Sequence, residues 1–176
     1  AKLQAAINCT LPAAPLDGWT NRSGVLSIAL NGQQFTGEAL EFAVYAEPSI
    51  SASSPTSGPI LGGTSVHVTG NGLRGGCDYT CAFDGESVPA TFNASFGVDG
   101  AILCRLPPMP HNGTTQLRVS LNGQQYSNTA PFGYHDVARV STSLPACGPV
   151  QGGSQLEIVG LPFSQRAADL RLLSCR

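Results

Sequence analysis

Six cysteines have the most distinctive chemistry in this sequence. Paired thiolates at metal-ligand spacing would bind zinc, but the two cysteines that lie four positions apart have no second pair to complete such a site. Cysteines without metal-ligand spacing are typical of disulfides, which persist in oxidising compartments. The sequence therefore predicts a disulfide-bearing protein without a metal site. The six are Cys9, Cys77, Cys81, Cys104, Cys147 and Cys175.

Four asparagines stand two positions before a Ser or Thr, which is the acceptor pattern for N-linked glycans. One such tripeptide is weak evidence, but four beside disulfide-type cysteines support each other and predict an extracellular glycoprotein, secreted or at the cell surface. Three lie in or beside predicted loops, and the fourth adjoins a strand cysteine whose bridge could form before glycan transfer. We expect glycans at Asn93, Asn112 and Asn21, in that order, and then at Asn8.

Histidines and carboxylates, the usual acid–base groups, do not form a recognisable catalytic pattern. His67 falls at an outward strand position, His111 in a proline-rich loop, and His135 beside Asp136. A catalytic histidine needs a nucleophile or carboxylate oriented in a pocket. The acidic residues also lack the dense ligand spacing of a calcium loop. We predict that the protein is not an enzyme and has no catalytic, cofactor-binding or metal-binding residue and no cofactor. The acidic residues considered are Asp78, Asp84, Glu86 and Asp99.

The bulk composition of the 176 residues excludes two further classes. Hydrophobic residues make up 41%, enough for a packed core, whereas charged residues make up only 11%, against about 25% in an average soluble protein. With nine basic residues and a net charge of −2, the chain lacks the excess of positive charge that attracts a polyanion. We therefore predict no nucleic-acid binding. No apolar run approaches the length of a membrane span, so we predict no membrane insertion by this segment.

An internal repeat organises the whole chain. Its period, about one sandwich domain long, predicts the tail of a first repeat at 1–46, a complete repeat at 47–136 and the head of a third at 137–176. We expect the chain to be an internal piece of something longer. Three matched pairs carry the repeat: Leu30–Phe35 with Leu121–Tyr126, 91 positions on; Gly62–Thr64 with Gly152–Ser154, 90 positions on; and Ile7–Pro12 with Ile102–Pro107, 95 positions on.

The segments inside the repeat are predicted to be short strands with alternating apolar residues. Val66 and Val68 alternate with polar neighbours, and Asn122-Gly123 is the dipeptide that a two-residue type I′ hairpin prefers. We expect tandem immunoglobulin-like β-sandwiches of about seven strands each, one complete and two partial, in an all-β fold. The aromatic residues expected in the core are Phe83, Phe92 and Phe132.

The repeat assigns partners to four cysteines. Cys81 and Cys104 each lie on a predicted strand of the complete repeat, and a bridge between them would pin the two strands together. Cys9 corresponds to Cys104 and Cys175 to Cys81, so we expect both to be half-disulfides whose partners lie outside the chain.

Cys77 and Cys147 have no counterpart in the repeat. A sandwich is longer than the ~7 Å that a disulfide spans between Cα atoms, so we expect them not to pair with each other in one copy. A bridge to a part of the protein outside this chain, a bridge to another molecule, and, for Cys77, a buried free thiol all stay open.

A resemblance to a known family follows from the stretch between Ser54 and Leu73. It reads Pro-x-x-Gly-Pro-x-x-Gly-Gly-Thr, then a strand, then Gly-x-x and a hydrophobic residue. This resembles the opening of an IPT/TIG domain, and the later strands with Cys81 and Cys104 also match that family. The resemblance implies immunoglobulin-like sandwiches used in series. Such domains occur in ectodomains of plexins and of fibrocystin-like surface proteins, in Rel-type transcription factors and in starch-acting enzymes.

The function expected is that of a structural or adhesive extracellular module, part of a larger glycoprotein that forms a stalk, a receptor stem or a fibre. Its partners would be other domains of the same chain, N-linked glycans and other protein subunits. Two alternatives stay open: a ligand-binding ectodomain of a receptor, and a non-catalytic accessory domain of an extracellular enzyme. Fold alone does not decide among them.

Overall fold

The computed structural model describes residues 6–10, 22–37, 40–97 and 99–163, with the side chain of Arg22 excepted. These ranges contain strands, turns and loops but no helix, so the predicted all-β class is confirmed. The strands are β1 (Arg22–Leu26), β2 (Leu40–Val44), β3 (Ser49–Ser54), β4 (Ser57–Pro59), β5 (Ser65–Asn71), β6 (Thr80–Phe83), β7 (Glu86–Asn93), β8 (Ala101–Arg105), β9 (Gly113–Ser120), β10 (Ala130–His135), β11 (Arg139–Leu144) and β12 (Glu157–Leu161).

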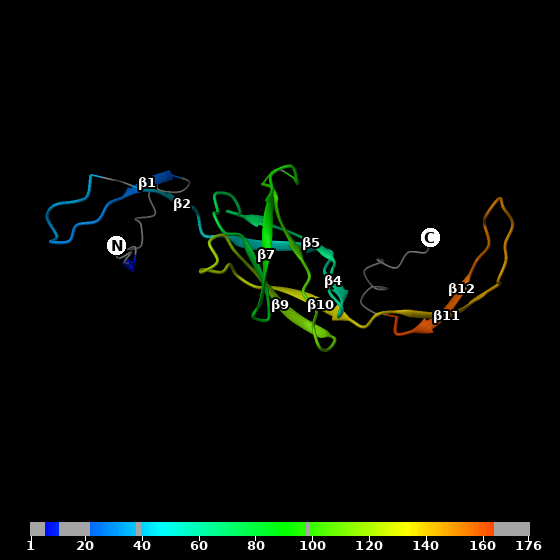
Figure 1. Ribbon diagram of the computed structural model, residues 1–176. Helices are drawn as coiled ribbons and strands as arrows, with labels where there is room; N and C mark the ends of the chain where they lie inside the picture. Colours follow the sequence, from blue (N-terminus) through cyan, green and yellow to red (C-terminus); the bar gives the residue numbers. More distant parts are fainter. Residues whose placement is uncertain (1–5, 11–21, 38–39, 98, 164–176) are drawn as a thin grey trace, which may run out of the picture. The chain divides into compact units, whose positions relative to one another are not determined.

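The chain divides into two compact units, Ala1–Ala46 and Glu47–Arg176. The first holds β1 paired antiparallel with β2. The second holds an eight-stranded sheet system, β3 to β10, and the antiparallel pair β11–β12 (Figure 1).

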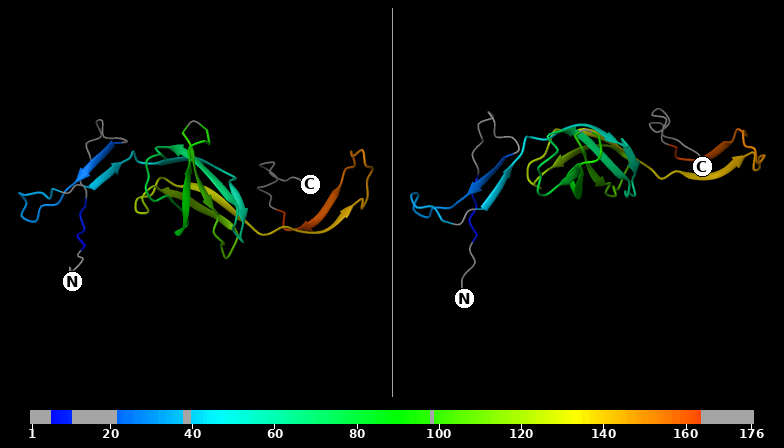
Figure 2. Two further views of the ribbon diagram at one scale, coloured as in Figure 1. Left: turned by 45° about the horizontal axis from the view of Figure 1, so that its top comes forward. Right: turned by 90° about the horizontal axis from the view of Figure 1, so that it is seen from above.

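Strands β3 to β10 form a two-layered sandwich (Figure 2) with the strand order β3-β5-β8-β7-β6-β9-β10-β4. Strand β7 belongs to both layers, because its first half pairs with β6 and its second half with β8. The sandwich has eight strands where the sequence predicts about seven. The additional strand is β4, which is three residues long and pairs in parallel with the end of β10.

The core follows the alternation of the strands. Val66 and Val68 on β5 are fully buried, whereas His67 between them is half-buried on the outer side. Leu117 and Val119 repeat the pattern on β9. Each such side chain contributes roughly 1.5–3 kcal/mol by leaving water.

Three aromatic rings occupy the core of the β6–β9–β10 layer. Phe83 meets Phe132 edge-on at a centroid distance of 5.4 Å and Tyr134 at 6.3 Å. The Tyr134 hydroxyl donates to the carbonyl of Pro107 at 3.0 Å, and Pro107 follows β8. Burial, together with the negative charges of Asp84 and Glu86, raises the pKa of Tyr134 to about 12, so this hydroxyl keeps its proton and its hydrogen bond.

Two local predictions are wrong. Phe92 is half-buried at the edge of the sandwich, where it stacks on Tyr79 with Arg74 over its face. Asn122-Gly123 does not form a type I′ turn, because φ is positive at Gly123 but not at Asn122. The side-chain oxygen of Asn122 instead accepts the N–H groups of the two residues that follow Gly123, at 3.0 and 3.1 Å, and this Asx-type closure needs an ordinary φ at asparagine.

The turn with positive φ at both central residues lies elsewhere. Asp84 has φ 47° and Gly85 has φ 98°, and they connect the paired residues Phe83 and Glu86 at the end of the β6–β7 hairpin. Asp84-Gly85 is one of the dipeptides that tolerate this geometry.

A disulfide joins the two layers between Cys81 on β6 and Cys104 on β8. Their Cα atoms are 6.2 Å apart and both side chains are buried. The bridge therefore ties one layer directly to the other through the core.

We expect the double substitution Cys81→Ala with Cys104→Ala to destabilise the sandwich by about 3 kcal/mol, because it frees a loop of 23 residues in the unfolded chain. Urea unfolding followed by circular dichroism measures the loss. The matched control is Cys77→Ala with Cys147→Ala, which changes two exposed thiols and should alter stability by less than about 0.5 kcal/mol. Equal stability of the two double variants would contradict the assigned role of the bridge.

Candidate functional site

The predicted glycan acceptors lie in different surroundings. Asn93 ends β7, and its side-chain oxygen accepts the backbone N–H of Ser95 at 3.0 Å. Asn112 is exposed, but its amide nitrogen donates to a carboxylate oxygen of Asp136 at 2.6 Å. Asn8 is exposed, and Asn21 lies outside the described residues. A glycan is attached to the amide nitrogen of asparagine, so transfer to Asn112 would have to break the hydrogen bond to Asp136 or leave one N–H of the amide to maintain it.

Three further cysteines are exposed and free: Cys9, Cys77 and Cys147. The alternative of a buried thiol at Cys77 is therefore wrong. The backbone N–H of Cys77 donates to the carbonyl of Leu121 at 3.0 Å, so the main chain is fixed there while the side chain faces solvent. Cys175 lies outside the described residues.

The histidines have structural surroundings. His67 stacks on Phe96 with their ring centroids 4.6 Å apart. The Nδ1 atom of His135 lies 2.9 Å from the backbone carbonyl of the next residue, Asp136, and His111 is exposed. Within the described ranges, no group of three or more His, Cys, Asp or Glu side chains is placed to hold a metal ion.

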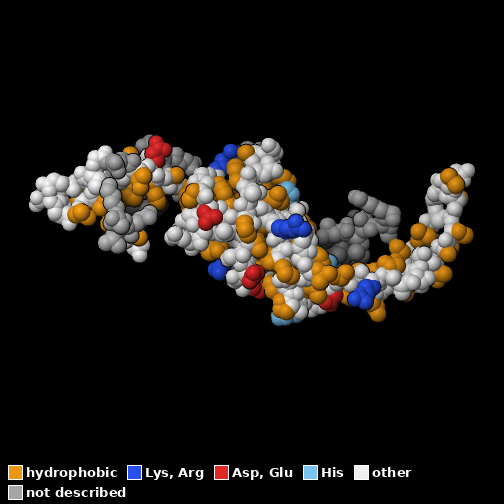
Figure 3. All heavy atoms as spheres, viewed as in Figure 1, with side chains coloured by type: hydrophobic (Ala, Val, Ile, Leu, Met, Phe, Trp, Pro, Cys, Tyr) orange, Lys and Arg blue, Asp and Glu red, His pale blue; other side chains and the backbone are white. Residues whose placement is uncertain are grey.

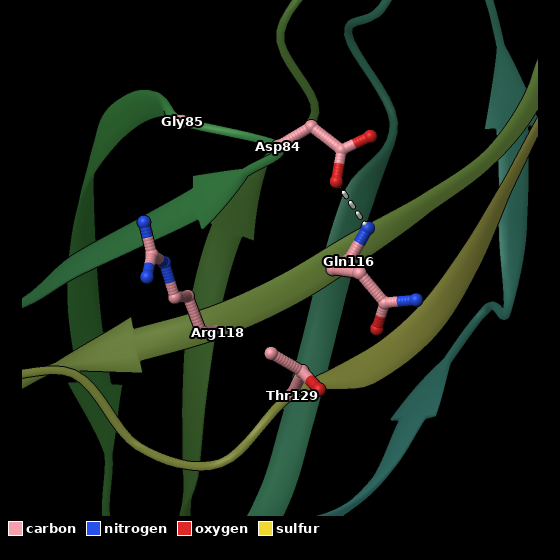
Figure 4. A pocket seen from close by; sticks show the side chains of 5 residues that line it. All are labelled: Asp84, Gly85, Gln116, Arg118 and Thr129. Carbon is pink, nitrogen blue, oxygen red and sulfur yellow. Dashed lines mark hydrogen bonds between the residues drawn. The ribbon is translucent and has the colours of Figure 1, made fainter.

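A shallow hollow of about 360 Å³ lies on the outer side of the β6–β9–β10 layer (Figure 4). The β6–β7 turn contributes Asp84 to its lining, and β9 contributes Gln116 and Arg118. The carboxylate of Asp84 accepts the backbone N–H of Gln116 at 2.7 Å. This carboxylate therefore fixes the turn against β9.

Tyr126 lies beside the hollow and is fixed at two points. The Arg118 guanidinium lies over its ring at 4.7 Å from the centroid, and its hydroxyl is 3.1 Å from the hydroxyl of Ser87 on β7. The hydrogen bond to Ser87 lowers the pKa of Tyr126, and the positive charge of Arg118 lowers it further. We call Ser87, Arg118 and Tyr126 the Tyr126 face.

The Tyr126 face offers recognition chemistry. A half-buried tyrosine under an arginine combines a flat ring with oriented donors, and both residue types are enriched at the energetic centres of protein interfaces. No nucleophile paired with an oriented base occurs among the described residues around it. The arrangement can bind a polar or aromatic group of a partner.

A family model described as the IPT/TIG domain matches residues 48–134. Residues 48–134 of this chain are an IPT/TIG domain. The resemblance drawn from the sequence is thus confirmed, and the match spans β3 to β9 in full together with all of β10 except its last residue, His135.

Three curated relatives also match. Plexin-B3 of Homo sapiens is 34% identical over 116 residues, covering 64% of this chain and 6% of its own length. Fibrocystin-L of Mus musculus is 27% identical over 168 residues, covering 94% and 4%. Protein mesh of Bombyx mori is 40% identical over 73 residues, covering 42% and 4%. The chain therefore spans only a small part of the relatives it matches.

The described part of the chain contains no helix with the length and apolarity needed to cross a membrane.

We expect Asn93 to carry a glycan when the chain is secreted from a eukaryotic cell, since it sits at a strand end with its side-chain oxygen already bonded to Ser95. Ser95→Ala should remove this glycan, because the hydroxyl of the acceptor pattern is lost. Ala94→Ser keeps the pattern and is the matched control. Glycopeptide mass spectrometry reads both variants, and unmodified Asn93 in the control would contradict the expectation.

Proposed function

We propose that this chain is a non-catalytic structural segment of an extracellular glycoprotein, in which immunoglobulin-like repeats follow one another in series as a stalk, receptor stem or fibre. The layout proposed is a partial repeat at 1–46, a complete repeat at 47–136 and a partial repeat at 137–176. The observation that carries the proposal is the recurrence of the same local geometry at a distance of one repeat.

The β1–β2 hairpin repeats the geometry of β9–β10. Leu26 pairs with Leu40 as Leu117 pairs with Ala130. The loops match as well: the side-chain oxygen of Asn31 accepts the backbone N–H groups of the second and third residues that follow it, at 3.1 and 3.0 Å, and Asn122 makes the same two bonds. Equal pairing and equal loop closure support a shared repeat better than sequence likeness alone.

The β11–β12 pair repeats the geometry of β3–β5. Both pairs have a register shift at the same place, after Val140 in β11 and after Ile50 in β3. The turns that follow β4 and its counterpart also agree, since the N–H of Gly62 donates to Pro59 at 2.9 Å and that of Gly152 to Pro149 at 3.0 Å. These agreements support a third repeat that begins near residue 137.

The connections between these segments are short. Three residues, 136–138, separate β10 from β11, and four, 45–48, separate β2 from β3. Serial domains on flexible tethers use longer Gly/Ser-rich tracts, so short junctions favour a mechanical role. The match to Fibrocystin-L over 94% of this chain extends beyond the single IPT/TIG domain and supports the same layout.

Several observations support an extracellular location for the protein. A disulfide crosses the core, and disulfides persist in oxidising compartments. Charged side chains are few and scattered over the visible face (Figure 3), which suits a surface covered by glycans at Asn93, Asn112, Asn21 and Asn8. Exposed Cys77 and Cys147 are available for bridges to other subunits or to other parts of the protein, and Cys9 and Cys175 for bridges to neighbouring segments.

A ligand-binding ectodomain is the second candidate, and the Tyr126 face favours it. Arg118 and Tyr126 occur together only in the complete repeat, because the corresponding residues of the first repeat are Ser27 and Phe35. A pair found in one repeat alone suits recognition better than a general scaffold role.

We expect residues 47–136 produced alone to fold, because within the described part of the chain the buried hydrophobic side chains all lie between Ile50 and Tyr134. Thermal unfolding should be cooperative, with a midpoint within a few degrees of that in the whole chain. An unfolded 47–136 fragment would contradict the repeat boundaries.

The two candidate functions differ in a binding assay. A structural segment predicts that Arg118→Ser with Tyr126→Ser leaves the attachment of chain-coated beads to cells unchanged. Loss of attachment in this variant, with normal attachment of the control Arg139→Ser, would favour the ligand-binding ectodomain instead.

A further inference from the structure

The hollow beside the Tyr126 face has one charge of each sign on its rim. Arg118 on β9 and Asp84 in the β6–β7 turn are the two charged residues among the five that line it (Figure 4). Ala82 pairs with Arg118, and Asp84 follows Ala82 by two positions, so the two charged residues lie about 7 Å apart along the strands. Asp84 and Gln116 are exposed and Arg118 is half-buried, so the rim of the hollow faces solvent.

The two charges are held apart from each other. The Arg118 guanidinium lies over the Tyr126 ring at 4.7 Å from the centroid, and the ring hydroxyl is 3.1 Å from the hydroxyl of Ser87. The Asp84 carboxylate instead accepts the backbone N–H of Gln116 at 2.7 Å. A guanidinium stacked on a ring keeps N–H donors at its edge, and a carboxylate that accepts one bond keeps lone pairs for others. Both charges are therefore available to an outside group of opposite sign.

A surface with this pattern is complementary to itself. Consider a two-fold axis that runs parallel to the layer and crosses the line between Arg118 and Asp84 midway, at a right angle. Rotation about this axis turns the surface of a second copy onto that of the first and exchanges the positions of the two side chains. The carboxylate of the second copy then lies on the Arg118 guanidinium, and its guanidinium lies on the Asp84 carboxylate. The two contacts are equivalent, as in every isologous dimer.

We propose that a second copy of this chain docks on this surface about that axis and forms two ion pairs, each between Arg118 of one copy and Asp84 of the other. A different protein would have to present an acid and a base at the same spacing, whereas a second copy inherently carries both. The association closes at the dimer, because the one surface of each copy is then used. The proposal concerns the IPT/TIG domain by itself and goes beyond the proposed function, whose serial layout it does not need.

The surroundings of the hollow permit the close approach of a second copy. Thr129, which also lines the hollow, is exposed, short and uncharged. The predicted glycan acceptors of the domain lie elsewhere. Asn93 ends β7 where that strand pairs with β8 of the other layer, and Asn112 precedes β9 by one residue, about 20 Å of strand from Arg118. Glycans at these two positions would leave the hollow uncovered.

Sedimentation velocity of the whole chain at increasing concentration tests the docking. Wild-type chain should pass from monomer to dimer as the concentration rises. The dimer should dissociate when the salt concentration is increased, because salt screens ion pairs at a protein surface.

Charge reversal at either residue tests the contact itself. In the Asp84→Arg chain two guanidinium groups would face each other at both contacts, and in the Arg118→Asp chain two carboxylates would. Each variant should raise the dissociation constant of the dimer by about a hundredfold or more. The matched controls are Asp99→Arg and Arg105→Asp, which make the same charge changes at exposed positions after β7 and on β8. Both controls should dimerise as the wild type does.

Mixing the two reversed chains separates a blocked contact from misfolding. Arg118 of the Asp84→Arg chain meets the native Asp84 of the Arg118→Asp chain, and the two introduced residues meet each other, so both contacts join unlike charges. The mixture should therefore form heterodimers although neither chain dimerises alone. The double variant, Asp84→Arg with Arg118→Asp, should dimerise with itself for the same reason.

Any of three outcomes would overturn the proposal. These are a wild-type chain that is monomeric at every concentration, reversed chains that dimerise as well as the controls, and a mixture of reversed chains that stays monomeric. The folding of the 47–136 fragment tests the repeat layout separately, so a failure of the docking and a failure of the proposed layout give different results.

Discussion

A β-sheet with one apolar face is stable in water only when another layer covers that face, and residues 47–136 meet this requirement around β6. Phe83 packs edge-on against Phe132 and Tyr134 within one layer, and Cys81 bonds Cys104 in the other. The Tyr134 hydroxyl adds a hydrogen bond to the carbonyl of Pro107. The position of every outer residue, including those of the Tyr126 face, depends on this closed pair of layers.

The same requirement explains the two hairpins outside the sandwich. They copy the register, bulge and loop closure of the complete domain, because these features follow from local hydrogen bonds and from the alternation of side chains. Their apolar residues stay exposed, because burial needs a second layer. Local geometry and burial are therefore determined separately in the described part of this chain.

The surface of the sandwich has recognition chemistry at one place and little charge elsewhere. Arg118 and Tyr126 are fixed by contacts with each other and with Ser87, so little side-chain entropy would be lost on binding. His67 is engaged in stacking, His135 in a backbone contact and Asp84 in closure of the β6–β7 turn.

Much of this protein follows from its sequence. The repeat, the alternation of Val66 and Val68 and the Gly-Pro and Gly-Gly motifs identified the all-β class and the IPT/TIG family, because strand period and turn chemistry are local properties. Local signals were insufficient at Asn122-Gly123, whose side chain closes a longer loop, and at Phe92, which lies at a sandwich edge. The Tyr126 face was not predicted, because Ser87 is distant in sequence from Arg118 and Tyr126 and meets them only when β7 and β9 join the same layer through β6. Tertiary structure alone decided which apolar residues are covered, since burial depends on the second layer and not on the strand that carries the side chain.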